Sequence, residues 1–371
     1  MEIFCAAKPG LEPVLAREMA ALGLAPHAPV PGGVTCEGSW TTVWRANRDL
    51  RCADRVLLRL ASFRAMHPAQ LDKRARKLPW ATWLPPGAAV TVEATSRKSR
   101  IYHAGAVKTR VAGAIEAALG AKAGGAPTHR VFARLDDDLC TLSLDTSGEP
   151  LHRRGAKTWV GKAPLRETLA AAFLAQCGYD PAEPLVDPMC GSGTILIEAA
   201  EIAAGLVPGR ARRFAFETLP SFDQRAYAAL PGAAPRAKAQ IWGAPRAKAQ
   251  IWGADRDQGA VAGAEANSAR AGVAKRITLT RAPLSDLAVP AGPPGLVLTN
   301  PPYGARIGNR KTLFGLYGAL GEVLRSRCRG WRLGIVTSEG GLARATGLDL
   351  TPGPPVPHGG LQIRLWQTGP I

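Results

Sequence analysis

The sequence predicts an α/β protein whose C-terminal half is a doubly wound, mainly parallel sheet. The chain has 371 residues, enough for two or three domains with their own cores. From residue 165 onward, short apolar strands alternate with helical patterns, as in parallel α/β sheets. One of these strands runs into a glycine-rich turn and then a long apolar helix, the arrangement of nucleotide-binding folds.

Two smaller units are predicted before this sheet. In residues 1–60, hydrophobic periodicity indicates a strand, a helix and a strand, at 3–6, 11–22 and 34–36. In residues 61–157 it indicates a strand, a helix and a strand, at 90–94, 107–119 and 139–145. The first helix stops at Gly23 and the second at Gly120, because glycine readily ends a helix.

The third unit, residues 163–371, carries the alternating pattern. We predict helices at 165–177, 194–204, 261–271 and 313–324. Parallel strands are predicted at 185–187, 251–255, 277–279, 295–299 and 333–337. A last strand at 361–366 is expected to pair antiparallel at the edge of the sheet. A ten-residue tandem repeat, 234–243 and 244–253, precedes Ala254; its effect on the strand at 251–255 stays open.

Charge is the most informative part of the composition. The chain has 47 Lys and Arg against 29 Asp and Glu, a formal net charge of +18. The excess is spread over the whole length, which favours a polyanionic partner that touches every unit. The alternative is a compositional bias toward Arg, Ala, Gly and Pro.

Other compositional features exclude several classes. No apolar run approaches the roughly 20 residues of a membrane span, and the N-terminus does not resemble a signal peptide, so we expect a cytoplasmic protein. The seven cysteines are scattered and never form a Cys-x-x-Cys pair, which predicts reduced, buried thiols and no metal site.

A glycine-rich turn follows the strand at 185–187. Gly191 and Gly193 allow a sharp turn and close approach of a ligand. The helix beginning at Thr194 offers free N–H groups that suit a ligand's carboxylate. Asp187 can accept hydrogen bonds from a ligand's ammonium group or from the backbone amides of the turn. No Gly-Lys-Ser/Thr is present, so the turn indicates a nucleoside cofactor and not the phosphate loop of an NTPase.

Acidic residues follow the next two strands. Asp255 ends the strand at 251–255, a position that faces a ribose in such folds. Asp286 follows the strand at 277–279 and is a candidate acceptor for an adenine amino group; the alternative is an ordinary turn.

The segment Asn300-Pro301-Pro302-Tyr303 follows the strand at 295–299, at the edge where ligands bind. The Asn300 amide oxygen and the Pro301 carbonyl can both accept from one exocyclic amino group. Tyr303 can stack on a flat base, worth about 1–3 kcal/mol. We therefore predict Asn300, Pro301 and Tyr303 as catalytic residues that hold an amino nitrogen on a ring.

Two basic segments are candidates for binding phosphate. Residues 96–103 interleave cations with hydroxyls and aromatic rings, and residues 151–155 contain two adjacent arginines. A solvated charged loop is the alternative for each. The predicted contacts to nucleic acid are Arg97, Lys98, Arg100, Tyr102, His103, Arg153 and Arg154.

Together these segments resemble the THUMP-domain RNA guanine-N2 methyltransferases, most of all the bacterial enzymes that act on 23S ribosomal RNA. The resemblance covers nearly the whole chain. Besides the two motifs above, it rests on SRIYHAG (99–105), TLSLDTSGEPLHRRG (141–155), APLRETLA (163–170) and GARIG (304–308). It implies a ferredoxin-like unit at 1–60, a THUMP RNA-binding domain at 61–157 and a Rossmann-like class I methyltransferase domain at 163–371.

The resemblance also implies an activity, a cofactor and a partner. The activity is methyl transfer from S-adenosylmethionine to N2 of a guanosine, in ribosomal RNA more than in tRNA, by a monomer without a metal. The residues expected to bind the cofactor are Thr168, Asp187, Cys190, Gly191, Gly193, Thr194, Asp255, Asp286 and Asn300. Family members often carry an acid where Pro283 stands, and whether Asp286 replaces it stays open. The alternatives are tRNA guanine-N2 methylation, adenine-N6 methylation and a non-catalytic RNA-binding assembly factor.

Overall fold

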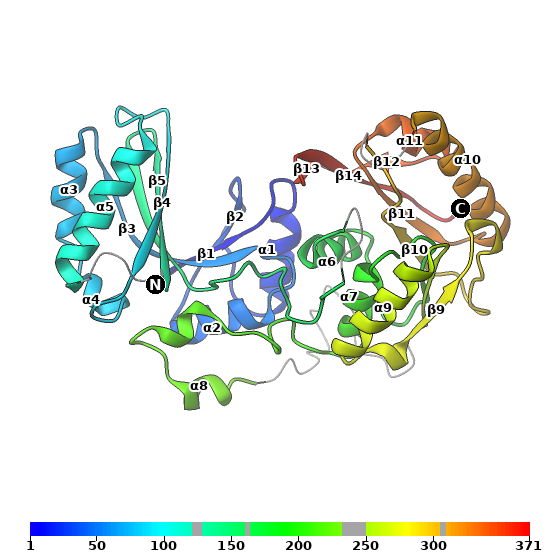
Figure 1. Cartoon of the computed structure of the whole chain (residues 1–371), viewed down its shortest axis with the longest axis horizontal. Helices are drawn as coiled ribbons and strands as arrows, with labels where there is room; N and C mark the ends of the chain where they lie inside the picture. Colours follow the sequence, from blue (N-terminus) through cyan, green and yellow to red (C-terminus); the bar gives the residue numbers. More distant parts are fainter. Residues whose placement is uncertain (121–127, 160–163, 232–249, 305–308) are drawn as a thin grey trace.

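The computed structural model describes residues 1–120, 128–159, 164–231, 250–304 and 309–371. These residues form two sheets, one in each half of the chain, with helices packed against them (Figure 1). The predicted α/β class is therefore confirmed. Residues 234–249 of the tandem repeat lie outside the described residues, and so do residues 305–308 of the segment GARIG.

The N-terminal sheet has the strand order β2-β1-β3-β6-β5-β4. Neighbouring strands are antiparallel except β4 and β5, which are parallel. The strands are β1 (Glu2–Ala6), β2 (Gly33–Glu37), β3 (Arg55–Arg64), β4 (Val90–Arg97), β5 (His129–Asp136) and β6 (Leu139–Asp145). Because β3 pairs with both β1 and β6, the two predicted N-terminal units share one continuous sheet, and the predicted boundary at residue 60 falls within β3.

Among the described residues, the helices that accompany this sheet are α1 (Glu12–Ala21), α2 (Trp40–Asp49), α3 (Pro68–Arg76), α4 (Trp80–Trp83) and α5 (Ala104–Leu119). Figure 1 shows α3 and α5 side by side next to β3, β4 and β5. Their inward side chains, such as Leu71 and Val111, are fully buried. α5 ends at Gly120, where φ is 64°, a left-handed conformation that suits glycine.

The C-terminal sheet has the order β12-β14-β11-β10-β7-β8-β9. Its parallel strands are β7 (Leu185–Asp187), β8 (Ile251–Asp255), β9 (Ile277–Arg281), β10 (Leu296–Thr299) and β11 (Arg332–Thr337). The chain order runs outward from β7 to β9 on one side and from β10 to β11 on the other. The adjacent strands β7 and β10 therefore form a topological switch point, where ligands bind at the carboxyl ends of such sheets.

The last strands complete this sheet. β14 (Leu361–Thr368) pairs antiparallel with β11, which confirms the predicted antiparallel pairing. It is not at the edge, because β12 (Thr351–Pro352) pairs with its other side. β13 (Val356–His358) also pairs with β14.

The helices around the C-terminal sheet are α6 (Glu167–Gln176), α7 (Thr194–Ala203), α9 (Gln258–Arg270), α10 (Arg310–Arg327) and α11 (Gly340–Ala345), with short 3-10 turns η2 (Ala274–Arg276) and η3 (Leu284–Asp286). In the described ranges, no helix is long and apolar enough to cross a membrane.

All seven cysteines are buried and free, as the sequence predicts.

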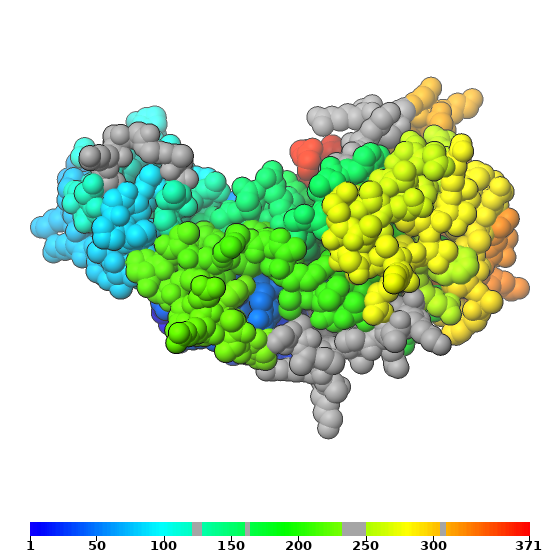
Figure 2. All heavy atoms as spheres, turned by 60° about the horizontal axis from the view of Figure 1, so that its bottom comes forward, coloured from blue at the N-terminus to red at the C-terminus, as the bar shows by residue number. Residues whose placement is uncertain are grey.

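The segment between α7 and β8 returns to the N-terminal half. It contains η1 (Ala215–Thr218) and α8 (Gln224–Ala228), and Figure 2 shows this green segment lying over blue residues of the N-terminal half. Phe216, Phe222 and Tyr227 surround Trp44 of α2, with ring centroids 5.7–6.3 Å from the Trp44 ring. This aromatic cluster thus fixes the segment that leads to the C-terminal sheet against the N-terminal half.

Candidate active site

The glycine-rich turn connects β7 to α7 as predicted. Gly191 has φ 51° and Gly193 has φ 76°, so both adopt the left-handed conformation that most side chains avoid. A Cβ on Gly193 would lie 3.0 Å from the Cβ of Ala264 in α9, whereas a Cβ on Gly191 would meet nothing within 4 Å. Gly193 is therefore needed for helix packing as well as for the turn, and Gly191 leaves its surface open to a ligand.

A cavity of about 320 Å³ lies at the carboxyl ends of the parallel strands, near the lower end of the range for small-molecule sites. Its wall is built from the segments that follow β7, β8, β9 and β10. The predicted site residues in the wall are Asp187, Cys190, Gly191, Thr194, Asp255, Asn300 and Pro301. The fold thus brings the two motifs, about a hundred residues apart in sequence, to one cavity at the switch point.

Asp187 is the buried carboxylate of this cavity. Its Oδ1 accepts hydrogen bonds from the Met189 amide at 3.2 Å and from the Thr299 hydroxyl at 2.7 Å. Burial raises the pKa of Asp187 to about 7, although the bond from Thr299 opposes the shift. Asp187 can therefore change its charge near neutral pH, and a cation in the cavity would favour its ionised form.

Asp255 supports the glycine turn from the end of β8. One carboxylate oxygen accepts from the Gly191 amide at 3.0 Å and the other from the Asp257 amide at 3.0 Å. Each oxygen keeps a second lone pair for a ligand. The strand β8 forms in register with β7 and β9, so the repeat upstream leaves Asp255 in the cavity wall.

The segment after β10 reaches the cavity with Asn300, Pro301 and Pro302. Tyr303 follows them but is only 6% exposed and does not belong to the wall formed by the described residues. Burial raises the pKa of Tyr303 to about 12. In this structure its ring is part of the core, so the predicted stacking on a base would require Tyr303 to move.

Three other predicted cofactor residues lie outside the wall formed by the described residues. Thr168 is buried and donates to Asp54 at 3.1 Å. Gly193 packs against α9. Asp286 is exposed in η3 and accepts from the Ser285 hydroxyl, while Pro283 lines the cavity. Asp286 thus does not take the position of the acid expected at Pro283.

The predicted RNA-contact segment lies on the N-terminal sheet, between β4 and α5. Arg97, Lys98, Arg100, Tyr102 and His103 are all exposed, and Tyr102 is 73% exposed. The loop is held to the turn between β5 and β6, where the Asp138 carboxylate accepts a hydrogen bond from the Arg100 amide at 2.7 Å. These side chains are accessible to a large ligand.

The adjacent arginines of the second basic segment have different environments. Arg153 is exposed and pairs with Glu149. Arg154 is only 7% exposed and forms two hydrogen bonds of 3.1 Å with the Glu198 carboxylate. The prediction that Arg154 contacts RNA is therefore not supported: its guanidinium faces the interior because a buried carboxylate requires a partner.

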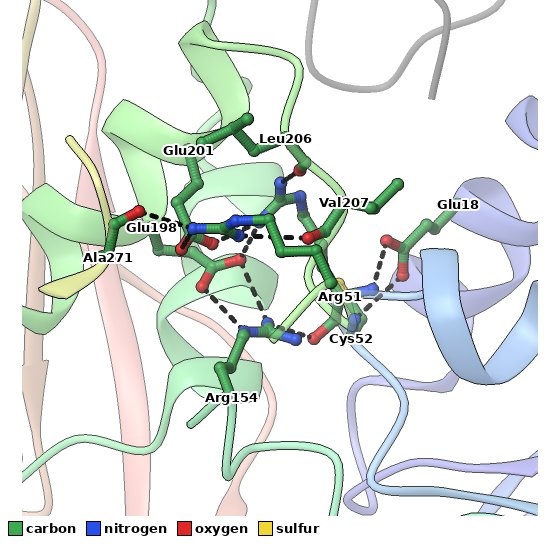
Figure 3. Close-up of polar contacts among 10 residues, drawn as sticks. Glu18, Arg51, Cys52, Arg154, Glu198, Glu201, Leu206, Val207 and Ala271 are labelled. Atoms are coloured by element: carbon green, nitrogen blue, oxygen red, sulfur yellow. Dashed lines mark hydrogen bonds and ion pairs between the residues drawn. The ribbon is translucent and has the colours of Figure 1, made fainter. Parts of the chain in front are cut away.

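Glu198 belongs to a buried ion-pair network that the sequence did not reveal (Figure 3). Its carboxylate also pairs with Arg51 at 2.5 Å, and Arg51 lies 3.4 Å from Glu201. Burial alone would lower the pKa of Arg51, but the two glutamates raise it. The Glu18 carboxylate of α1 accepts a hydrogen bond from the backbone amide of Arg51 at 2.7 Å. The network joins the N-terminal half to α7, the helix that begins at the cofactor turn.

Lys157 is a second residue that no motif identified. Its Nζ donates to the Thr194 hydroxyl at 2.8 Å and to the Leu165 carbonyl at 3.2 Å, and it lies 3.6 Å from Glu167. Lys157 thereby fixes the first residue of α7 from outside the cavity. No group of three or more His, Cys, Asp or Glu residues is arranged to hold a metal ion in the described part of the chain.

Comparisons with protein families match three consecutive regions. Residues 2–57 match the RlmL ferredoxin-like domain, residues 68–145 the THUMP domain, and residues 154–349 the RMKL-like methyltransferase domain. The last match covers more than half of the chain and contains the cavity.

Individual relatives agree with these matches. The ribosomal RNA large subunit methyltransferase K/L of Methylococcus capsulatus is 36% identical over 98% of this chain, but over only 50% of its own length. The putative RNA methyltransferase slr0064 of Synechocystis is 31% identical over 96% of this chain and 93% of that protein. The chain thus spans about half the length of the K/L relatives and nearly all of slr0064.

A solved structure shows the same fold. SMU.472, described as a putative methyltransferase complexed with SAH, is 28% identical, with a TM-score of 0.86 over 100% of this chain and 98% of that one. The fold, the domain order and the sequence identity to relatives agree, and the chain belongs to the RMKL-like methyltransferase family with N-terminal ferredoxin-like and THUMP domains.

Proposed function

We propose that this protein methylates the exocyclic N2 of a guanosine in large-subunit ribosomal RNA, with S-adenosylmethionine as methyl donor. It would act in the cytoplasm and as a monomer. The observation that carries the proposal is that Asn300 and Pro301 share one cavity with Asp187, Gly191 and Asp255. A site for an amino group and a site for a nucleoside cofactor thus meet at the switch point of one sheet.

The wall offers polar groups for the methionine moiety and for the ribose of S-adenosylmethionine. Asp187 offers a buried carboxylate to the ammonium of the methionine moiety, and the first turn of α7 offers N–H groups to its carboxylate. Asp255 can accept from the ribose hydroxyls. When bound, S-adenosylmethionine supplies an activated methyl group on its sulfonium and leaves as a neutral thioether.

Asn300 and Pro301 would act on the target base. Guanine N2 is a poor nucleophile because its lone pair is delocalised into the ring. Acceptors on both amino protons would favour a pyramidal nitrogen and stabilise the positive charge that develops on it. Positioning supplies much of the remaining acceleration, because the two reacting atoms are held at about 3–3.5 Å. The target base must leave its stack to enter the cavity.

RNA is favoured as substrate by the N-terminal half of the chain. The exposed loop from Arg97 to His103 combines cations with an aromatic ring, which suits a nucleic-acid backbone with unstacked bases. The net charge of +18 suits a polyanion. The name of the K/L relatives favours ribosomal RNA, although this chain spans about half of their length.

Nucleoside mass spectrometry tests the proposal. Unmodified large-subunit RNA, small-subunit RNA and tRNA transcripts would each be incubated with the protein and methyl-labelled S-adenosylmethionine, then digested to nucleosides. We expect N2-methylguanosine from the large-subunit RNA. N6-methyladenosine, or N2-methylguanosine from tRNA alone, would overturn the substrate assignment. Binding of RNA without any methyl transfer would favour a non-catalytic assembly factor.

A matched pair of variants tests the site. Asn300→Ala removes the proposed acceptor in the cavity wall, and Asn309→Ala makes the same change at the N-cap of α10, outside that wall. We expect Asn300→Ala to lower the rate of transfer at least a hundredfold, far more than it lowers the affinity for S-adenosylmethionine, as for other lost transition-state hydrogen bonds. Asn309→Ala should stay within a few-fold of wild type. Full activity of Asn300→Ala would contradict the mechanism.

A further inference from the structure

A second group of charged residues lies where the N-terminal half meets the C-terminal sheet. We name it the seam cluster: Lys8, Asp54, His152, Arg166 and His358. Lys8 and Asp54 come from the loops that follow β1 and precede β3, and His152 from the segment after β6. Arg166 is the N-cap of α6 and His358 ends β13. His152 and Arg166 belong to segments that carry the family resemblance, but the proposed mechanism gives none of the five residues a role.

The acid of the seam cluster already has partners for both oxygens. The Asp54 carboxylate pairs with Lys8 Nζ at 3.1 Å through one oxygen and accepts from the Thr168 hydroxyl at 3.1 Å through the other. Arg166 stands two residues before Thr168, and its guanidinium has no ion pair or hydrogen bond within the described ranges. The seam cluster therefore holds two cations against one acid.

The two imidazoles of the seam cluster face this excess positive charge. Burial and then the positive charge of Arg166 lower the pKa of His152 to about 4. Burial and then Arg166 also lower the pKa of His358. Both rings are thus neutral at neutral pH, and the Nδ1 atoms of both have no hydrogen-bond partner in the described part of the chain. The charge of Arg166 therefore acts on one ring from each half of the chain.

The seam cluster is next to the cavity and remains accessible. His358 Nε2 lies 3.2 Å from the carbonyl oxygen of Pro164, and Pro164 belongs to the cavity wall. The Lys8 side chain is 27% exposed, and Arg166 is also partly exposed. A strand of RNA that delivers a base into the cavity would have its backbone beside these cations.

We propose that Arg166 and Lys8 bind a backbone phosphate next to the target nucleotide. The inference rests on the proposed function, since it takes RNA as the substrate. Arginine is well suited to this task, because its planar guanidinium can donate two hydrogen bonds to one phosphate. A base that has left its stack is held precisely only if its own backbone is fixed. The seam cluster would supply this fixed point, far in sequence from the exposed loop on the N-terminal sheet.

Salt dependence of RNA binding tests the proposal. The dissociation constant of the full-length protein for unmodified large-subunit RNA would be measured over a series of KCl concentrations. The variants are Arg166→Ala, Arg166→Lys and Lys8→Ala. The control, Lys275→Ala, removes an exposed cation of η2 at the opposite edge of the C-terminal sheet. Affinity for S-adenosylmethionine would be measured on the same samples.

We expect Arg166→Ala and Lys8→Ala each to weaken RNA binding several-fold and to reduce the slope of log affinity against log salt by about one. Arg166→Lys should keep the slope, and the control should match wild type. Unchanged slopes for both alanine variants would overturn the proposal. So would loss of S-adenosylmethionine affinity with normal RNA binding, because Arg166 would then bind the cofactor's carboxylate. If Arg166→Ala does not fold, the salt slope of Lys8→Ala alone tests the proposal.

These results do not depend on the proposed reaction. The salt slope counts phosphate contacts whether or not a methyl group is transferred. The proposed function fails if the wild-type protein forms no N2-methylguanosine, whereas the phosphate site fails if the slopes of both alanine variants are unchanged, whether or not a methyl group is transferred.

Discussion

Removing Glu198 from the buried network should destabilise the protein more than removing any surface charge. The Glu198 carboxylate lies between Arg51 and Arg154, at 2.5 Å and 3.1 Å. The side chains of all three residues are no more than 6% exposed. Solvent and salt therefore screen these ion pairs very little.

The magnitude follows from the partners that remain. In Glu198→Ala, Arg51 would keep Glu201 at 3.4 Å, but Arg154 would keep only the carbonyl oxygen of Arg51 at 3.0 Å. Leaving one member of a buried ion pair without its partner costs about 3–5 kcal/mol. Glu198→Gln keeps an acceptor oxygen at the same place, so we expect a smaller loss, about 1.5–3 kcal/mol, typical of a hydrogen bond to a charged group.

Urea denaturation measures the loss, with Glu149→Ala as the matched control. Glu149 pairs with Arg153, and both side chains are at least 65% exposed, so its removal should cost less than about 1 kcal/mol and nothing at high salt. The Glu198→Ala loss should persist at 1 M salt. A loss below about 1 kcal/mol for Glu198→Ala, or one that disappears at high salt, would refute the view that this network is buried and joins the two halves.

Three further predictions concern the site and the corrected arginine. Because an ionised Asp187 would attract the cofactor's ammonium, calorimetry should show S-adenosylmethionine affinity rising with pH through about 7, by up to about tenfold per unit below that value. Thr299→Val removes the bond that lowers the pKa and should move the rise to higher pH; a flat profile would exclude this role. Gly193→Val should lower the free energy of unfolding by more than about 1 kcal/mol, since φ is 76° and α9 is in contact; an unchanged urea midpoint would contradict the packing. Arg154→Ala should lower the free energy of unfolding but leave the salt slope of RNA binding unchanged. Arg153→Ala should leave the free energy of unfolding nearly unchanged but reduce the salt slope.

The sequence predicted the parts of the site that depend on local patterns. Short apolar runs bounded by turns gave β7 and β8 with their observed ends, because a buried parallel strand needs a continuous apolar stretch. Asp187, Asp255 and Asn300 follow such strands directly. Strand order at a switch point then places them at one edge, so their convergence on one cavity followed from the motif order alone.

Long-range packing decided the rest. Arg153 and Arg154 are chemically identical neighbours, and only the buried Glu198, 44 residues further on, makes one interior and the other exposed. Likewise, β3 is not among the strands predicted from the sequence, and nothing local shows that this strand pairs with both β1 and β6. Tyr303 is predicted to stack on a base, but its ring is buried in the core.

The central claim is that this cavity joins a methyl group to an exocyclic amino nitrogen of guanosine. The most direct measurement combines S-adenosylmethionine carrying a ¹³C methyl group with large-subunit RNA whose guanine amino nitrogens are ¹⁵N. Nuclear magnetic resonance of the digested product should show a one-bond ¹³C–¹⁵N coupling in N2-methylguanosine. A methylated product without that coupling, or no labelled product under conditions where RNA and S-adenosylmethionine both bind, would contradict the claim.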